Sequence, residues 1–298
     1  MLLRRFPFKA MGCPCEIRVY AETDNAAARF LETGRAEITR LENKYSRYRD
    51  DSVTTLINRS AGNAQGVAVD DETAALLDYA AQCHEQSDGL FDLTSGVLRR
   101  AWDFRASRPP APETVSALLP LVGWRKLNWQ RPLLRLPAAM ELDFGGFVKE
   151  YAADGAARVC RDAGARHGLV DLGGDIALIG AHPDGSAWRV GIRHPRAPDT
   201  AIADVDLASG AITSSGDYER FIEHDGRRYG HILDPRSGWP VEGLSSVSVV
   251  AAHCLIAGTA STVAMLKGAT EGPRWLEALG LPYFYVTADG QTGGTLAV

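Results

Sequence analysis

Hydroxyl, carboxylate and imidazole side chains are concentrated in the stretch 213–240, TSSGDYERFIEHDGRRYGHILDPRSGWP. Asp225-Gly226 is a dipeptide that closes two-residue hairpins, and the Asp-Pro-Arg-Ser-Gly run further on is rich in turn-forming residues. The pattern therefore predicts a hydroxyl-rich loop at 213–216, followed by a hairpin whose return strand carries His231.

This hairpin is expected to bring Asp217, His231 and Asp234 to one end of a short sheet. An imidazole has a pKa of about 6.5, so it can take a proton from a hydroxyl near neutral pH. Turns of these types also occur where no chemistry takes place, and a histidine beside a strand is often structural. The residues by themselves leave both interpretations open.

A second stretch, ELDFGGFVKEYAAD at 141–154, predicts a helix start that could hold phosphate. We expect a strand that ends at Asp143-Phe144, a Gly-Gly turn, and a helix that begins at Phe147. Backbone N–H groups at the start of a helix are unpaired and lie at its positive dipole end, and Lys149 would add a cation. The motif is neither a Walker A loop nor a GxGxxG fingerprint, and an ordinary strand-to-helix turn gives the same pattern.

The composition is that of a folded globular protein. The 298 residues are 45% hydrophobic and 23% charged, with a net charge of -5 and no Lys/Arg run, which excludes a general nucleic-acid binder. The chain has no run of 18 apolar residues and no apolar segment of signal-peptide length near its start, so we expect no membrane span and a cytoplasmic location. The sequence leaves open whether a leader was removed from a longer precursor. Five scattered cysteines favour reduced thiols.

Periodicity predicts helices and strands that do not strictly alternate. A helix that starts after Thr23 or Asp24 has an apolar stripe up to Tyr45, and a second helix, about 71–86, ends before a Ser-Asp-Gly stop signal. Without repeats or linkers, the chain is predicted to be one compact α+β domain, 1–298. The other expected elements are loops at 90–96 and 102–112, strands at 16–21, 126–129, 133–136, 169–176, 188–194, 201–207, 245–252 and 283–287, and helices at 255–266 and 273–279.

Over essentially its whole length the chain resembles the ApbE family, the FAD:protein FMN transferases. The 213–240 stretch is similar to the family's TSGDYER…dGkryHIidPrTGxP block, and 143–154 is similar to its DLGaiaKGyavD motif. The other segments that match, in the family's order, are Ala10-Met11-Gly12 (AMGT), 46–58 (SxYxxxSxxxxxN), 90–94 (AFDxT) and 172–175 (NxGGD).

The resemblance implies an α+β fold with a mixed, largely antiparallel sheet and flanking helices. It also implies an enzyme that, with Mg²⁺, cleaves the FAD pyrophosphate, releases AMP and passes FMN through a phosphoester to a Thr or Ser hydroxyl of an acceptor flavoprotein. Some members of the family hydrolyse FAD to FMN and AMP instead. The implied partners are FAD and an acceptor protein or peptide, with no nucleic acid and no membrane span.

The resemblance also implies roles for individual positions. His231 and Asp234 would lie at the reacting phosphate, with His231 as the base for the acceptor hydroxyl. Thr262 and the Gly146 backbone carbonyl would hold the metal ion. The implied FAD contacts are Met11, Tyr48, Leu90, Phe91, Asp92, Asp143, Lys149, Ser214 and Asp217.

Two positions depart from the family pattern. The family has ADxxxT on a late helix, with the Asp and the Thr on one face, whereas this chain keeps Thr262 and has Gly258 at the Asp position. Losing that carboxylate removes most of the charge that binds Mg²⁺. The family has Lys-Gly where this chain has Lys149-Glu150, and the hypothesis is that Glu150, or another acid nearby, replaces the missing ligand. The alternatives to an FMN transferase are an FAD pyrophosphatase without an acceptor and a non-catalytic FAD-binding protein without the metal.

Overall fold

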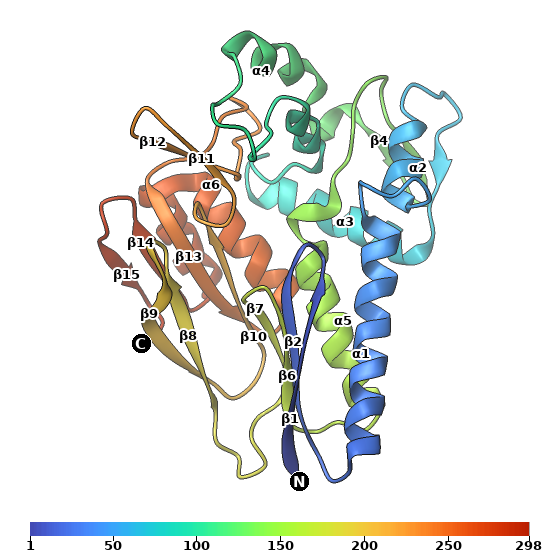
Figure 1. The fold of residues 1–298 in the computed structure, drawn as a ribbon. Coiled ribbons are helices and arrows are strands. Elements are labelled where there is room, and N and C mark those ends of the chain that lie inside the picture. Colours follow the sequence, from blue (N-terminus) through green and yellow to red (C-terminus); the bar gives the residue numbers. More distant parts are fainter. Residues whose placement is uncertain (298) are drawn as a thin grey trace.

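An eight-stranded sheet forms the centre of the computed structural model, which describes residues 1–297 (Figure 1). Every pair of neighbouring strands in this sheet runs antiparallel, so the α+β class and the largely antiparallel sheet are confirmed. In spatial order the strands are β1 (Leu2–Ala10), β2 (Cys13–Ala21), β6 (Gly168–Leu172), β7 (Asp175–Gly180), β10 (Ala211–Gly216), β13 (Leu244–Ala251), β14 (Tyr283–Thr287) and β15 (Thr292–Gly294).

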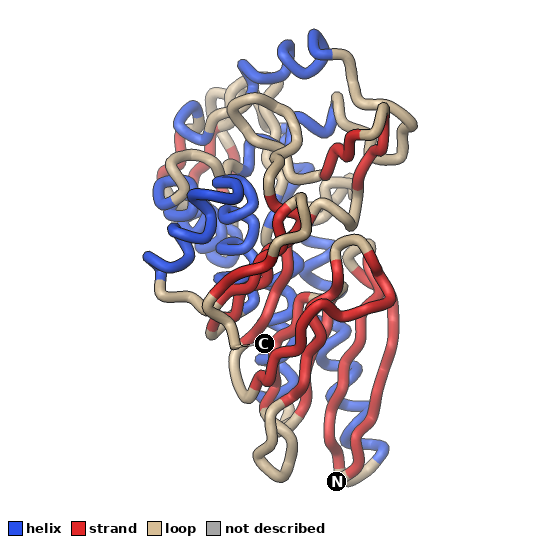
Figure 2. Tube along the Cα trace, turned by 90° about the vertical axis from the view of Figure 1, so that its left-hand side faces the viewer, coloured by secondary structure: helices blue, strands red, loops and turns tan. Residues whose placement is uncertain are grey.

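Three long helices cover one face of the sheet and a hairpin covers the other (Figures 1 and 2). The helices are α1 (Asp24–Tyr45), α5 (Val148–Asp162) and α6 (Cys254–Leu279), and the hairpin is formed by β8 (Trp188–His194) and β9 (Ala197–Leu207). Successive side chains of a strand point to opposite faces, so the strand β6 divides its residues between two cores. Val170 and Leu172 pack with the helices, whereas Leu169 packs with the β8–β9 hairpin.

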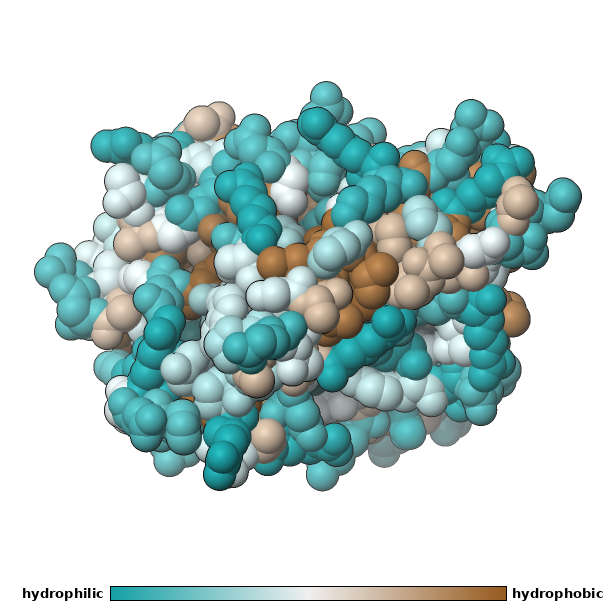
Figure 3. Space-filling model, turned by 90° about the horizontal axis from the view of Figure 1, so that it is seen from above, coloured by the Kyte–Doolittle hydropathy of each residue, from teal (hydrophilic) through white to brown (hydrophobic). Residues whose placement is uncertain are grey.

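Short elements gather at the upper end of the molecule in Figure 1. They are α2 (Val53–Arg59), β3 (Val67–Ala68), α3 (Asp71–Gln86), α4 (Pro112–Leu118), β4 (Asn128–Gln130), β5 (Leu133–Arg135), β11 (Phe221–His224), β12 (Arg227–Gly230) and the 3-10 helices η1 (Leu93–Arg100), η2 (Leu119–Leu121), η3 (Trp124–Lys126) and η4 (Phe144–Gly146). Val97 and Leu98 of η1 pack in one core with Ile222 of β11, which fixes the β11–β12 hairpin against η1. Seen from this end, the surface is mostly hydrophilic, with a hydrophobic patch near its middle (Figure 3).

Most of the elements expected from the sequence are confirmed. The Thr23 hydroxyl accepts a hydrogen bond from the Ala26 N–H at 3.2 Å and caps α1, which ends at Tyr45. The helix α3 has the predicted limits. The Asp225-Gly226 turn joins β11 to β12 with positive φ at both residues, 50° and 74°, as a primed hairpin turn requires. Within residues 1–297 no helix is long and apolar enough to cross a membrane.

Two expectations about the site segments are wrong. The stretch 213–216 belongs to the strand β10 of the central sheet and is not a loop, because it pairs with β13 on one side while β10 pairs with β7 on the other. The strand expected to end at Asp143-Phe144 is absent from the described chain, and Asp143 instead caps the 3-10 helix η4 by accepting from the Gly145 N–H.

Three further differences lie in other segments. The single strand expected at 169–176 is two antiparallel strands, β6 and β7, joined by a turn at Gly173-Gly174. Trp102 is buried in the segment 102–112, which was expected to be a surface loop, and the helix α4, which was not predicted, begins at the last residue of that segment. The expected polar loop at 90–96 contains the start of η1 and several buried apolar side chains. The two helices expected at 255–266 and 273–279 are confirmed as the two parts of α6, which are separated at Gly268, where the backbone is not helical and φ is 78°.

Candidate active site

The N-terminus of α5 has no side-chain cap within the described residues. Phe147 occupies the N-cap position, and Gly145 and Gly146, both exposed, come just before it. The first backbone N–H groups of the helix therefore have no side-chain acceptor, and Lys149 lies in the same turn. Unpaired N–H groups, the helix dipole and a lysine together suit an anion such as phosphate.

Polar contacts link Lys149 to the strand β10. The Lys149 ammonium pairs with Asp175 at the start of β7 and donates to the Leu172 carbonyl at 3.4 Å. The other Asp175 oxygen accepts from the Ser214 backbone N–H at 3.3 Å. The Ser214 hydroxyl lies 2.7 Å from the hydroxyl of Ser248 on β13. Lys149 and Ser214 are thus held by the central sheet.

Hydroxyl groups gather where β10 meets α6. Ser215 Oγ lies 2.8 Å from Ser261 Oγ and 3.0 Å from Thr262 Oγ1. Thr213 lies two residues before Ser215 in the same strand, so both side chains point to the helix-covered face of the sheet. Thr213 Oγ1 is buried and has no hydrogen-bond partner within residues 1–297. This face of β10 therefore presents several oxygen atoms toward α6.

The Glu150 side chain lies against α6 at Gly258. A β-carbon built on Gly258 would be 2.5 Å from Glu150 Cγ and 3.2 Å from Oε1. The Glu150 side chain is 12% exposed, and its Oε2 is buried without a hydrogen-bond partner among the described residues. Burial raises the pKa of the Glu150 carboxyl, while Lys149 Nζ, 3.8 Å from Oε1, acts in the opposite direction.

His231 follows directly after β12, and its ring packs edge-to-face on Phe104 with 6.5 Å between the ring centroids. Its Nδ1 is buried and unpartnered in the described chain. Burial lowers the pKa of His231 to about 4. Three cations act in the same direction, namely Arg220, Arg99 and Lys149. The ring is therefore neutral at pH 7 and a weak base in the free protein, and its surroundings carry positive charge that a bound phosphate would offset.

Three buried side-chain polar atoms have no hydrogen-bond partner within residues 1–297: Glu150 Oε2, Thr213 Oγ1 and His231 Nδ1. They come from α5, from β10 and from the turn after β12, which are distant in the sequence. Folded proteins leave few such atoms unpaired, because each costs about 1–3 kcal/mol of desolvation free energy. All three belong to segments in which the sequence predicted the active site. This is the pattern of a site completed by a ligand.

Two of the predicted FAD contacts, Asp92 and Asp217, are aspartates whose oxygens are bound within the chain. Asp217 forms a bidentate ion pair with Arg196 at 2.6 and 2.7 Å. Asp92 Oδ1 accepts from the Thr94 N–H, and Oδ2 accepts from the Trp124 N–H, both at 2.8 Å. These carboxylates hold neighbouring loops in place.

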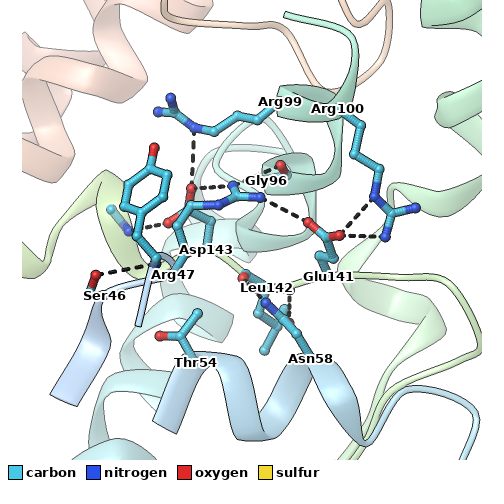
Figure 4. A network of polar contacts seen from close by, with 12 residues as sticks. Ser46, Arg47, Thr54, Asn58, Gly96, Arg99, Arg100, Glu141, Leu142 and Asp143 are labelled. Atoms are coloured by element: carbon cyan, nitrogen blue, oxygen red, sulfur yellow. Dashed lines mark hydrogen bonds and ion pairs between the residues drawn. The ribbon is translucent and has the colours of Figure 1, made fainter. Parts of the chain in front are cut away.

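Asp143, a third predicted contact, belongs to a network of arginine and acidic side chains (Figure 4). Arg47 donates to Asp143 Oδ2 and to Glu141 Oε2, both at 2.9 Å, and Arg99 Nε lies 3.3 Å from Asp143 Oδ2. Arg100 donates to the other Glu141 oxygen at 2.8 Å. The network fixes the segment that leads into α5. It borders a surface hollow of about 430 Å³, whose lining residues do not include His231.

The remaining predicted residues are divided between buried and exposed positions. Met11 lies in the β1–β2 turn with a positive φ of 54°. The Tyr48 ring is 83% exposed, so one aromatic face is free to stack on a planar ligand. Leu90 and Phe91 are buried. Asp234 is in the turn after His231, where its Oδ1 accepts a hydrogen bond from the Arg236 N–H at 2.8 Å. Gly146 comes just before α5, and Thr262 lies on α6 beside Ser215.

Comparison with known protein families supplies the deciding observation. The sequence profile described as the ApbE family matches residues 11–285. The chain belongs to the ApbE family. The FAD:protein FMN transferase of Vibrio cholerae is 29% identical over 293 residues, which cover 94% of this chain and 86% of that protein. The FAD:protein FMN transferase of Treponema pallidum is 30% identical over 279 residues, which cover 87% of this chain and 77% of that protein.

Solved structures of ApbE proteins have the same fold. The ApbE protein of Thermotoga maritima superposes with a TM-score of 0.91 at 29% identity, covering 99% of this chain and 97% of that chain. The apo form of the flavinyl transferase ApbE of Pseudomonas stutzeri superposes with a TM-score of 0.86 at 32% identity, covering 99% and 95%. The likeness therefore includes the whole of the sheet and its helices.

Three side chains near the candidate site were not assigned from the sequence: Arg99, Asp175 and Arg220. Asp175 and Arg220 lie inside segments that match family motifs, so the motifs themselves were the signal. Ser215 was expected in a loop at 213–217 that lines the pocket, and it lies in the strand β10. Arg99 lies in no motif, and it approaches His231 because η1 packs on the β11–β12 hairpin.

Proposed function

We propose that this protein cleaves the pyrophosphate of FAD and transfers FMN to a Thr or Ser hydroxyl of an acceptor protein, with release of AMP. Its ApbE relatives named as FAD:protein FMN transferases support this class of reaction. The observation that carries the proposal is the group of unpartnered buried atoms, Glu150 Oε2, Thr213 Oγ1 and His231 Nδ1. A protein that used these segments only for packing would pair them internally.

The pyrophosphate is proposed to bind at the start of α5. There the uncapped N–H groups of the helix and the Lys149 ammonium supply positive charge. Arg99 and Arg220, whose charges act on His231, add to it from η1 and from the segment before β11. Phosphoryl transfer requires such charge, because negative charge spreads over the phosphate oxygens in the transition state.

His231 is proposed as the base. Its neutral ring takes the proton from the acceptor hydroxyl as the hydroxyl oxygen forms a bond to the phosphorus of the FMN half. The bond from that phosphorus to the bridging oxygen breaks, and the oxygen leaves with AMP. Asp234, three residues further on in the same turn, is proposed to act at the same phosphate.

The other FAD contacts are proposed from the family motifs and from exposure. The Tyr48 ring, which is open to solvent, is suited to stack on a flavin or adenine ring. Met11, Leu90 and Phe91 supply apolar surface. The internally paired carboxylates and the serine are proposed to shape the pocket around the ligand: Asp92, Asp143, Asp217 and Ser214.

Mg²⁺ is proposed as the metal, held by Thr262 Oγ1 and by the Gly146 backbone carbonyl. These donors and their hydroxyl neighbours on β10 and α6 are all oxygen, which suits a hard cation. When bound, Mg²⁺ neutralises charge on the pyrophosphate oxygens. Residues 1–297 contain no group of three or more His, Cys, Asp or Glu arranged for a metal, so the cation would have at most two such ligands.

The test is to incubate the pure protein with FAD, with and without Mg²⁺, and with and without a flavoprotein acceptor that has an accessible Thr or Ser. AMP and free FMN are measured by chromatography, and covalent flavin is measured as a fluorescent acceptor band after denaturing electrophoresis. We expect AMP and acceptor-bound flavin in equal amounts, only with Mg²⁺. AMP with free FMN and no labelled acceptor would identify a pyrophosphatase. FAD that stays intact in every arm would overturn the proposal, and intact FAD that elutes with the protein would identify a flavin-binding protein.

A further inference from the structure

Gly258 lies inside a helix, where glycine has no conformational advantage. Its φ is not in the left-handed region, and the helix continues on both sides of it. Glycine within a helix is less favourable than alanine, because more backbone entropy is lost on folding. The reason for glycine at this position must therefore be space.

The side chain that needs the space is Glu150. Even a single β-carbon at position 258 would lie 2.5 Å from Glu150 Cγ and 3.1 Å from Cδ. Glu150 and any larger residue at 258 therefore exclude one another in this arrangement. The structure places a carboxylate from α5 in the volume that a side chain at 258 on α6 would fill.

The contacts of Glu150 within residues 1–297 leave one of its carboxylate oxygens without a partner. Glu150 Oε1 is 3.8 Å from Lys149 Nζ, but that ammonium already pairs with Asp175. Glu150 Oε2 is buried and has no hydrogen-bond partner within residues 1–297. A buried carboxylate oxygen without a partner is costly, so it is expected only where something absent from the chain itself binds it.

Hydroxyl oxygens lie on the same face of α6. Thr262 is four residues after Gly258, so the two positions are neighbours on one helix face, about 6 Å apart along the axis. Thr262 Oγ1 is 3.0 Å from Ser215 Oγ of β10, and Ser261 adds a further hydroxyl. A carboxylate next to hydroxyl groups, beside a helix start suited to phosphate, is a donor set for a hard divalent cation.

We propose that Glu150 supplies the carboxylate ligand of a divalent-cation site that it shares with Thr262, and that Gly258 is glycine so that Glu150 can reach it. The anionic ligand thus comes from α5, while α6 supplies the hydroxyl and the space. The identity of the site as the metal site of the transfer reaction rests on the proposed function; the binding of a cation by Glu150 does not.

The first test uses Mn²⁺ as the probe, because free Mn²⁺ is counted directly by electron paramagnetic resonance. The full chain is titrated with Mn²⁺ alone and with AMP present, so that no turnover occurs. We expect Glu150→Gln, which keeps the shape and removes the charge, to weaken Mn²⁺ binding at least tenfold. The matched control is Glu37→Gln, a carboxylate of α1 with similar exposure (13%) that is paired with Arg40, and the affinity of this variant for Mn²⁺ should not change. Wild-type affinity in folded Glu150→Gln would overturn the proposal.

The second test moves the carboxylate from one helix to the other. Gly258→Asp alone should lower the melting temperature, because the new side chain overlaps Glu150. The double exchange Glu150→Gly with Gly258→Asp removes the overlap and returns a carboxylate to the face of Thr262. We expect it to regain Mn²⁺ affinity to within about threefold of wild type. This variant decides the matter if Glu150→Gln does not fold, and a folded double variant that binds no Mn²⁺ would contradict the inference.

The two proposals fail in different ways. A protein that binds Mn²⁺ through Glu150 but releases no AMP from FAD overturns the proposed reaction and leaves the cation site intact. If the protein transfers FMN and the Glu150→Gln variant binds Mn²⁺ with wild-type affinity, the proposed reaction stands and the assignment of Glu150 as a ligand is wrong.

Discussion

Two polar groups flank the start of α5, and they differ in how far the chain satisfies them. In the network of Figure 4, Asp143 and Glu141 are each bound by two arginines, which come from different elements. In the active-site group, Glu150, Thr213 and His231 each keep a buried atom without a partner in the described chain. Both groups contain carboxylates of similar exposure, 13–19% in the first and 12% in the second.

The difference separates residues that position the site from residues that meet its ligand. A buried charge with strong partners contributes to a fixed geometry, and removing a partner is costly. A buried polar atom without a partner lowers stability until something binds it. Residue type alone does not distinguish these cases. The following substitutions test the distinction, from the largest expected effect to the smallest.

Removing the proposed base should have the largest effect. His231→Gln is expected to slow FMN transfer by about 10²–10⁴-fold, the usual contribution of a general base, with FAD affinity changed by only a few fold. Single-turnover release of AMP measures the rate, and fluorescence titration measures FAD binding. His224→Gln is the matched control, since His224 is 39% exposed on β11. Transfer at the wild-type rate in His231→Gln would remove this residue from the mechanism.

Breaking the satisfied network should reduce stability rather than chemistry. Arg47 is 17% exposed, and Arg47→Ala would leave Asp143 and Glu141 with one arginine each. We expect the free energy of unfolding to fall by about 3 kcal/mol, as for a partly buried ion pair that loses one member. Urea titration measures it. Arg49→Ala is the control, because its partner Asp51 is 71% exposed and such surface pairs contribute at most about 1 kcal/mol. Equal losses in both variants would refute the distinction.

The depressed pKa of His231 should make stability depend on pH on the acid side. The folded pKa is about 4 and the ordinary value is 6.5, so between these values the unfolded chain binds the proton more readily than the folded chain. The free energy of unfolding is therefore independent of this group above pH 6.5 and falls as the pH drops toward 4, by about 3 kcal/mol in all. Urea unfolding at several pH values should show that His231→Gln lacks this part of the decline. Parallel curves for the variant and the wild type would contradict it.

The smallest effect should have the opposite sign. Thr213→Val keeps the side-chain shape and removes a buried hydroxyl that has no partner, so it should stabilise the free protein by about 1 kcal/mol. The same variant should bind FAD more weakly. Ser248→Ala is the contrasting variant, because it removes the hydroxyl that pairs with Ser214 and should destabilise. Calorimetric melting with and without FAD measures both effects. Destabilisation by Thr213→Val would mean that the hydroxyl has a partner after all.

The elements with strong local signals were predictable from the sequence. The limits of α1 and α3 follow from their caps, Thr23 and Asp70, and from apolar periodicity. The strand β10 was not predictable, because its Thr-Ser-Ser-Gly end has no alternation of apolar and polar residues, and it is a strand only through pairing with β7 and β13. The helix α4 was missed because its N-cap is Ala111, which forms no side-chain cap.

The sequence by itself determined which chemical groups are available and where the chain departs from its family: a neutral base candidate at His231, a lysine at a helix start, and the paired departures Glu150 and Gly258. Only the tertiary structure decided which of the acids are free. Hydrogen bonds and ion pairs act over about 3 Å, and the partners of Asp143 and Asp217 come from segments distant in the sequence. Until α5, α6 and β10 pack together, nothing distinguishes a carboxylate that holds the fold from one that is left for a ligand.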